Sequence, residues 1–338
     1  MSNYNGNSSS VDLPRQRGNT AWWAQACGMA AVLLVCCGAY AAEPAANAPA
    51  ATAPAAAAVP AGIETFDTPE HAASAIVAAA QSWDTAKLSE ILGPDGNEII
   101  YSGDYISDRQ RGADFATQAA KKTHVAVDPK TGQRATIFVG DNDWPFPVPL
   151  VKRNGKWVFD AAAGARELMY RRIGENELDA IDICRGYVEA QISYALRPRE
   201  GYAVAQYAQR IISSPGKQDG LAWQNADGTW AGPIGENIAK AIKEGLVPYH
   251  GYFFKILTGQ GPAARLGQMD YVINGVMIGG FALVASPAEY GVTGFKTFLV
   301  SYDGVVYQKD LGAKSNALYQ KMERYDPDKS WQVVPDDE

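Results

Sequence analysis

The spacing of apolar positions first predicts two short helices near the start of the folded part. Thr68-Pro69-Glu70 offers an N-cap, a proline at the first helical position and an early acidic residue, and Ala- and Val-rich spacing follows. The pattern breaks at Trp83-Asp84 and restarts over residues 88–92, after which Gly93 can close the second helix.

The spacing then shortens to the alternation that is typical of strands. Thr123–Val127 and Arg134–Val139 are predicted strands around the turn-rich residues 128–132. Prolines at alternate positions of residues 144–149 remove backbone donors along one side, which predicts an edge strand or a polyproline-type segment. Residues 150–160 are a predicted hairpin, because Asn154-Gly155 favours the positive φ values of a type I′ turn.

A long amphipathic helix opens the second half. Its buried stripe is predicted from apolar residues at three- and four-residue steps: Leu178, Ile181, Cys184, Val188, Ile192 and Ala195. Residues 203–212 are a second predicted helix, which Ser-Ser-Pro-Gly at 213–216 ends. The predicted strands that follow are 252–257, 271–273, 276–278, 281–285, 297–301 and 305–309, with turns at Asn274-Gly275 and Asp303-Gly304.

This order of elements predicts an α+β fold in two domains, residues 63–165 and 166–331, before an acidic tail at 332–338. Helices followed by a curved antiparallel sheet that ends on Gly-Lys-Trp-x-Phe resemble the cone of NTF2-like domains over residues 64–162. The long helix and antiparallel meander resemble secreted pilin-like and pseudopilin-like domains. That resemblance rests on residues 280–287, 290–294, 298–300 and 303–306, and on the helical stretch 187–195. The helix is internal and polar on one face, unlike the apolar N-terminal helix of pilins, which argues against polymerisation into a pilus.

The first 62 residues have the features of an export signal followed by a spacer. Arg15 and Arg17 precede an uncharged apolar run over residues 22–41, and Ala39-Tyr40-Ala41 supplies the small residues of a cleavage site. We therefore predict a signal peptide over residues 1–41. The alternative is an uncleaved membrane anchor, since the run is about long enough to cross a hydrocarbon core of roughly 30 Å. Leu33-Leu34-Val35-Cys36 fits a lipidation site less well, because a bulky valine precedes the cysteine.

Residues 42–62 are almost entirely alanine and proline, which predicts an extended spacer. Cys27, Cys36 and Cys37 fall within the export segment, so Cys184 is alone in the body and is predicted to pack in the core. The chain has a formal net charge of −7, which argues against nucleic acid as a partner.

Candidate chemistry is sparse. The histidines lie far apart in the sequence, without the spacing of metal ligands, and no cofactor is predicted. His250 is the only candidate catalytic residue, and Tyr249, His250, Tyr252 and Trp144 are candidate binding residues. Asp141 and Asp143 are weak candidates for a calcium site, but an Asp-Asn-Asp cluster is also a common turn.

The folded body as a whole resembles the bacterial exported family called domain of unknown function 2950. The resemblance rests on four motifs: Trp144-Pro145-Phe146-Pro147, Ser214-Pro215-Gly216-Lys217, Tyr249-His250-Gly251-Tyr252 and Tyr307-Gln308-Lys309-Asp310-Leu311-Gly312. The family implies no activity. We therefore predict an exported cell-envelope protein, periplasmic or extracellular, or anchored in the inner membrane if the leader stays uncleaved. Its body is predicted to bind or scaffold another envelope protein rather than to catalyse. The alternative is a periplasmic hydrolase with a pocket in the N-terminal cone.

Overall fold

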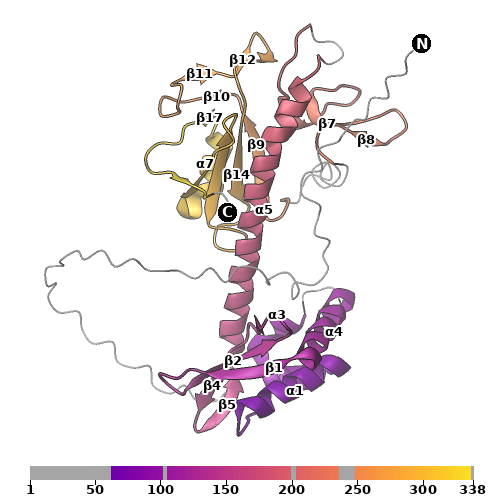
Figure 1. Ribbon diagram of the computed structural model, residues 1–338, viewed down its shortest axis with the longest axis vertical. Helices are drawn as coiled ribbons and strands as arrows, with labels where there is room; N and C mark the ends of the chain where they lie inside the picture. The colour runs from indigo at the N-terminus through magenta and orange to yellow at the C-terminus, as the bar shows by residue number, and fades with distance from the viewer. Residues whose placement is uncertain (1–61, 102–104, 199–202, 236–247, 336–338) are drawn as a thin grey trace, which may run out of the picture. The chain divides into compact units, whose positions relative to one another are not determined.

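The computed structural model describes residues 62–101, 105–198, 203–235 and 248–335. Two compact units divide these residues, 62–168 and 169–335. Helices combine with largely antiparallel sheets, so the predicted α+β class is confirmed (Figure 1). The export segment and nearly all of the spacer lie outside the described residues. None of the helices in the described ranges is long and apolar enough to cross a membrane.

The first unit opens with the two predicted helices. The hydroxyl of Thr68 accepts a hydrogen bond from the N–H of His71 at 3.2 Å, and Trp83 ends the first helix with a φ of 51°. Asp84 caps the second helix, and Gly93 ends it. The helices of this unit are α1 (Pro69–Ser82), α2 (Thr85–Leu92), the 3₁₀ turn η1 (Pro94–Gly96), α3 (Asn97–Ile100) and α4 (Tyr105–Lys121).

Helix α4 has no counterpart among the sequence predictions. Its apolar residues are mostly small, and Gly112 in its middle weakens the helical pattern. The structure gives this glycine a packing role, since a β-carbon on Gly112 would lie 2.6 Å from the ring of Trp83. Helix α4 packs against α1 through this close approach.

The sheet of the first unit follows the predicted strands. Its strand order is β1-β2-β4-β5, and β3 pairs with the same side of β2 as β4 does. The short edge strand β3 fits the loss of donors at the alternate prolines. The strands are β1 (Thr123–Val127), β2 (Arg134–Val139), β3 (Trp144–Pro145), β4 (Leu150–Arg153) and β5 (Lys156–Phe159). Asn154 and Gly155 join β4 to β5 with φ values of 51° and 80°, as the type I′ turn requires.

Replacing Asn154 and Gly155 together with valine should lower the free energy of unfolding by about 1–3 kcal/mol, because β-branched residues are strained at positive φ. Both positions are exposed, so the substitution loses no core packing. Thermal and urea unfolding measure the effect, and Asn154→Gly serves as the control that keeps the turn. An unchanged melting temperature in the double variant would contradict the turn assignment.

The interior between the helices and the sheet of the first unit is filled by large apolar side chains. Those that are at most 5% exposed include Phe115, Ile137, Trp144, Phe146, Val148, Leu150, Trp157 and Phe159. Within the described part of this unit, Asp108 is the one buried charged side chain, and it pairs with Arg111 one turn along α4. The core therefore excludes charge almost completely.

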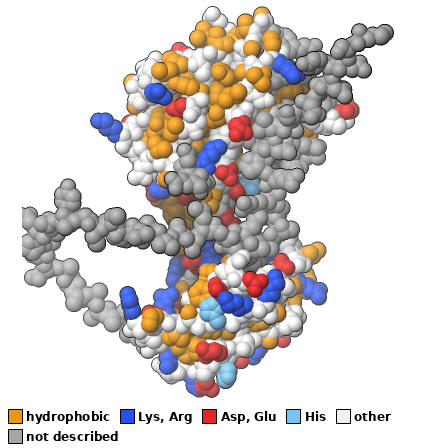
Figure 2. All heavy atoms as spheres, viewed as in Figure 1, with side chains coloured by type: hydrophobic (Ala, Val, Ile, Leu, Met, Phe, Trp, Pro, Cys, Tyr) orange, Lys and Arg blue, Asp and Glu red, His pale blue; other side chains and the backbone are white. Residues whose placement is uncertain are grey.

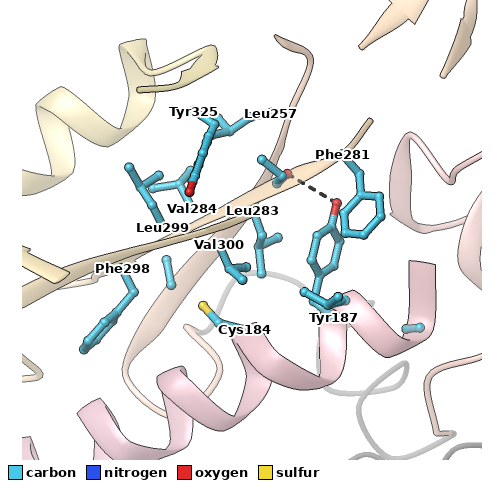
Figure 3. Close-up of a cluster of buried hydrophobic side chains, with 14 of the residues drawn as sticks. Cys184, Tyr187, Leu257, Phe281, Leu283, Val284, Phe298, Leu299, Val300 and Tyr325 are labelled. Atoms are coloured by element: carbon cyan, nitrogen blue, oxygen red, sulfur yellow. Dashed lines mark hydrogen bonds between the residues drawn. The ribbon is translucent and has the colours of Figure 1, made fainter. Parts of the chain in front are cut away.

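The long helix α5 (Ala161–Ala195), whose residues from Met169 onward belong to the second unit, packs on the five-stranded sheet of that unit, as predicted. The strand order is β18-β16-β15-β14-β9, with antiparallel pairing throughout. Figure 3 shows Cys184 and Tyr187 of α5 against Leu283, Phe298 and Val300 of the sheet. The strands of this sheet are β9 (Tyr252–Leu257), β14 (Ala282–Pro287), β15 (Lys296–Ser301), β16 (Val306–Asp310) and β18 (Gln332–Val333).

Smaller elements complete the unit. Helix α7 (Ser315–Lys321) packs against β14, and its Tyr319 stacks on Phe253 of the neighbouring strand β9 with ring centroids 6.3 Å apart. The remaining described strands form three small sheets. The first contains β6 (Arg210–Ile212), β7 (Gly220–Gln224) and β8 (Trp230–Ala231), and the second contains β10 (Gly259–Gln260), β11 (Met269–Asp270) and β17 (Arg324–Tyr325). The third is the pair β12 (Val272–Ile273) and β13 (Val276–Met277). The 3₁₀ turn η2 (Gly312–Lys314) leads into α7 (Ser315–Lys321).

The buried stripe of α5 differs from the predicted one. Leu178 and Ile192 are 61% and 52% exposed, whereas Tyr187, Gln191 and Tyr194 are buried. The predicted stripe left out tyrosine and glutamine residues. These side chains can be buried here because their polar atoms form hydrogen bonds inside the core. The prediction that Cys184 packs in the core is confirmed, and burial raises the pKa of its thiol to about 12.

The predicted helix over residues 203–212 is wrong. The described residues from 203 onward are extended or bent, and Arg210–Ile212 forms β6, parallel to β7. The side-chain amide of Gln191 holds both backbone groups of Ala208 at 2.8 Å, and the N–H of Tyr207 donates to the carbonyl of Met277. These tertiary bonds satisfy backbone groups that a helix would have used internally.

Candidate functional site

His250 and Gly251 form a two-residue turn at the entrance to β9. Tyr249 and Tyr252 exchange two backbone hydrogen bonds of 3.0 Å across it, and the φ values of His250 and Gly251 are 47° and 73°. Histidine is among the few non-glycine residues that adopt positive φ with some frequency. Glycine at position 251 suits the positive φ, and it also avoids a clash, because a β-carbon there would lie 2.6 Å from the side-chain nitrogen of Asn176.

The imidazole of His250 contacts a carboxylate of α5. Nδ1 of His250 lies 2.5 Å from Oδ2 of Asp179, and the two side chains are 33% and 44% exposed. An ionised carboxylate can only accept, so the proton of this bond belongs to Nδ1. The neutral ring then presents Nε2 as an acceptor. This contact fixes the orientation of the imidazole ring.

Glu175 lies one turn before Asp179 on α5. Burial raises the pKa of the Glu175 carboxyl above its usual range, the nearby Asp179 raises it further, and Arg171 lowers it. Proximity of the two carboxyls therefore adds to the cost of ionising Glu175.

Two further side chains of α5 attach the loop between β14 and β15 to this helix. The amide of Asn176 donates to the carbonyl of Thr293 at 2.9 Å. One carboxylate oxygen of Glu177 accepts from the N–H groups of Phe295 and Lys296, at 2.8 and 3.0 Å. Helix α5 therefore contacts both the loop and the His250 turn through its side chains.

The two tyrosines of the candidate motif have different surroundings. Tyr252 is 1% exposed, its hydroxyl donates to the carbonyl of Lys296, and burial raises its pKa. Gly294 lies so close that a β-carbon there would be 2.1 Å from the Tyr252 hydroxyl oxygen. Tyr249 is half-buried and meets the ring of His250 edge-on, with centroids 4.4 Å apart. Of the two tyrosines, Tyr249 alone lies where it can contact a ligand.

The other candidate residues belong to the first unit. Trp144 is 5% exposed within the core of that unit. Asp141 and Asp143 are exposed in the turn before β3. Asp143 binds Nζ of Lys122 at 2.7 Å, which holds the pKa of its carboxyl below the usual range, and it lies 3.4 Å from Nδ1 of His124. Groups of three or more side chains suited to hold a metal ion do not occur in the described ranges.

Sequence reasoning missed Asp179 and Glu175. Glu175 and Asp179 are four residues apart on a predicted helix, and this spacing indicates that both carboxyls lie on one face. Nothing in the local sequence linked either of them to His250, because 71 residues separate Asp179 from that turn. Only the packing of α5 beside the sheet brings Asp179 to His250.

The fold and the site define a class: a two-unit α+β protein with an apolar core in the first unit and an Asp–His pair in the second. Residues 63–334 match the family described as "Protein of unknown function (DUF2950)". The chain belongs to this family. Searches of curated proteins and of solved structures found no match.

Proposed function

We propose that this chain is an exported cell-envelope protein whose folded body is a binding or scaffolding module. Arg15, Arg17 and the apolar run over residues 22–41 support export into the periplasm. The Ala/Pro spacer would hold the body away from the membrane, at about 3.1 Å per residue where it is extended. On the face that Figure 2 shows, basic and acidic side chains lie among one another, which favours a protein partner over nucleic acid.

The packing inside the first unit favours a binding function over a hydrolase. A hydrolase of the alternative type would need convergent Asp, His or Arg side chains inside this unit. The described interior instead contains packed aromatic and aliphatic side chains, with Asp108 paired to Arg111 as its buried charge. Recognition on the outer surface is the function that this packing supports best.

A cross-linking pull-down tests the proposal. The full-length chain, tagged at its C-terminus, is cross-linked in intact cells, recovered from the envelope fraction and analysed by mass spectrometry. The matched control carries the same residues 1–62 on an unrelated globular body. We expect one envelope protein to be recovered with the full chain and not with the control. Equal recovery with both proteins would show that the body binds nothing and would contradict the proposal.

A further inference from the structure

Strand β1 ends the sheet of the first unit, and no strand pairs along its outer edge among the residues that the structure describes. Its residues Thr123–Val127 are exposed except for the half-buried Val125. Within the described ranges, β2 is the only strand that pairs with β1. The opposite edge of the same sheet is closed differently, because Phe66 and Trp157 of β5 exchange two backbone hydrogen bonds of 2.8 Å.

The hydrogen-bond pattern shows which backbone groups face outward. The N–H of Gly140 donates to the carbonyl of Lys122, and the N–H of Asp128 donates to the carbonyl of Arg134. In an antiparallel pair such bonds recur at every second residue. Even-numbered residues of β1 therefore bond to β2, and the N–H and C=O groups of Thr123, Val125 and Val127 point away from the sheet.

This edge lacks the usual protection against pairing. Exposed edge strands generally carry lysine, proline, a bulge or an inward charge. The sequence Thr-His-Val-Ala-Val has no proline and no Lys, Arg, Asp or Glu, and three of its five residues are threonine or valine, which favour strands. An open edge of this composition is suited to accept another strand.

We propose that β1 pairs with β1 of a second copy of this chain, antiparallel and centred on Val125. In this register Val125 faces its own counterpart, and Thr123 faces Val127 of the other copy. Every residue so matched has outward-facing backbone groups, so each matched pair forms two hydrogen bonds. The two sheets join into one continuous sheet across a two-fold axis.

The charged residues at the two ends of β1 favour a second copy of the chain as the partner. Lys122 precedes β1 and Asp128 follows it, and the register places Lys122 of each copy opposite Asp128 of the other. Such directly opposed charges are close neighbours in an antiparallel sheet. Lys122 is about half exposed in its contact with Asp143, so its side chain is accessible to a second carboxylate. A parallel pairing would instead bring like charges together.

Sedimentation velocity of the full-length chain between about 1 and 100 µM tests this pairing, because small interfaces associate in that range. We expect a concentration-dependent dimer. Val125→Pro should abolish the dimer, because the proline removes the outward N–H at the centre of β1. The substitution removes no hydrogen bond to β2, since the N–H of Val125 points away from that strand. A chain that stays monomeric throughout, or a dimer that survives Val125→Pro, would overturn the proposal.

Charge reversal tests the register separately, with circular dichroism confirming that each variant is folded. Lys122→Asp and Asp128→Lys should each weaken the dimer about tenfold, because like charges then meet at both ends. An equimolar mixture of the two variants should regain it, since each new charge then faces an opposite one. Failure of the mixture to associate more tightly than either variant alone would overturn the register.

Discussion

Replacing Gln191 with leucine should lower the free energy of unfolding of the second unit by about 2–5 kcal/mol. Gln191 is fully buried, and its amide binds the N–H and the C=O of Ala208, each at 2.8 Å, and the hydroxyl of Tyr187 at 2.9 Å. Leucine fills a similar volume but leaves both backbone groups of Ala208 without a partner. An unsatisfied buried polar group costs about 1–3 kcal/mol.

Urea unfolding followed by circular dichroism measures this loss. Gln209→Leu is the matched control, because Gln209 is exposed and its amide makes one bond, to the carbonyl of Gly275. We expect the control to change stability by less than about 0.5 kcal/mol. Equal losses in the two variants would contradict the role given to Gln191 in holding residues 207–208.

Replacing Phe298 with alanine should cost about 3–5 kcal/mol, the range for removing a fully buried phenylalanine. Phe298 is 0% exposed and lies on the face of the sheet that α5 covers (Figure 3). Its ring centroid lies 5.8 Å from that of Tyr252. The substitution leaves a cavity between α5 and the sheet and removes the ring contact with Tyr252. Thermal and urea unfolding of the full chain measure the loss.

Leu178→Ala is the control for this substitution. Leu178 belongs to the stripe that the sequence predicted as buried, but it is 61% exposed. We expect a loss below about 0.5 kcal/mol. A loss as large as that of Phe298→Ala would show that the predicted stripe was right and that the observed one is wrong.

Local signals in the sequence predicted the parts of the fold that depend on local interactions. The N-cap of α1 lies at Thr68 because its side chain bonds to the N–H group three residues ahead, and α2 begins just after the predicted break at Trp83-Asp84. The Asn154-Gly155 hairpin follows from positive φ at two adjacent residues. Strands β9, β14, β15 and β16 followed from apolar runs separated by turns.

Long-range contacts determined what the sequence could not predict. Residues 203–212 have a helical pattern, yet Gln191 and Met277 bind their backbone in an extended form. The same limit applied to the candidate site. His250 stood out by its motif, whereas its partner Asp179 looked like an ordinary surface residue of an amphipathic helix. A single sequence carries no sign that two residues so far apart will touch.

The compartment and the mature N-terminus test the proposed export most directly. Intact cells are fractionated, and the N-terminal peptide of the purified chain is identified by mass spectrometry. We predict a periplasmic or extracellular protein that begins at Ala42, after cleavage between Ala41 and Ala42. A membrane protein with an intact leader and its body in the periplasm would support the anchored alternative. A soluble cytoplasmic protein that retains residues 1–41 would contradict export.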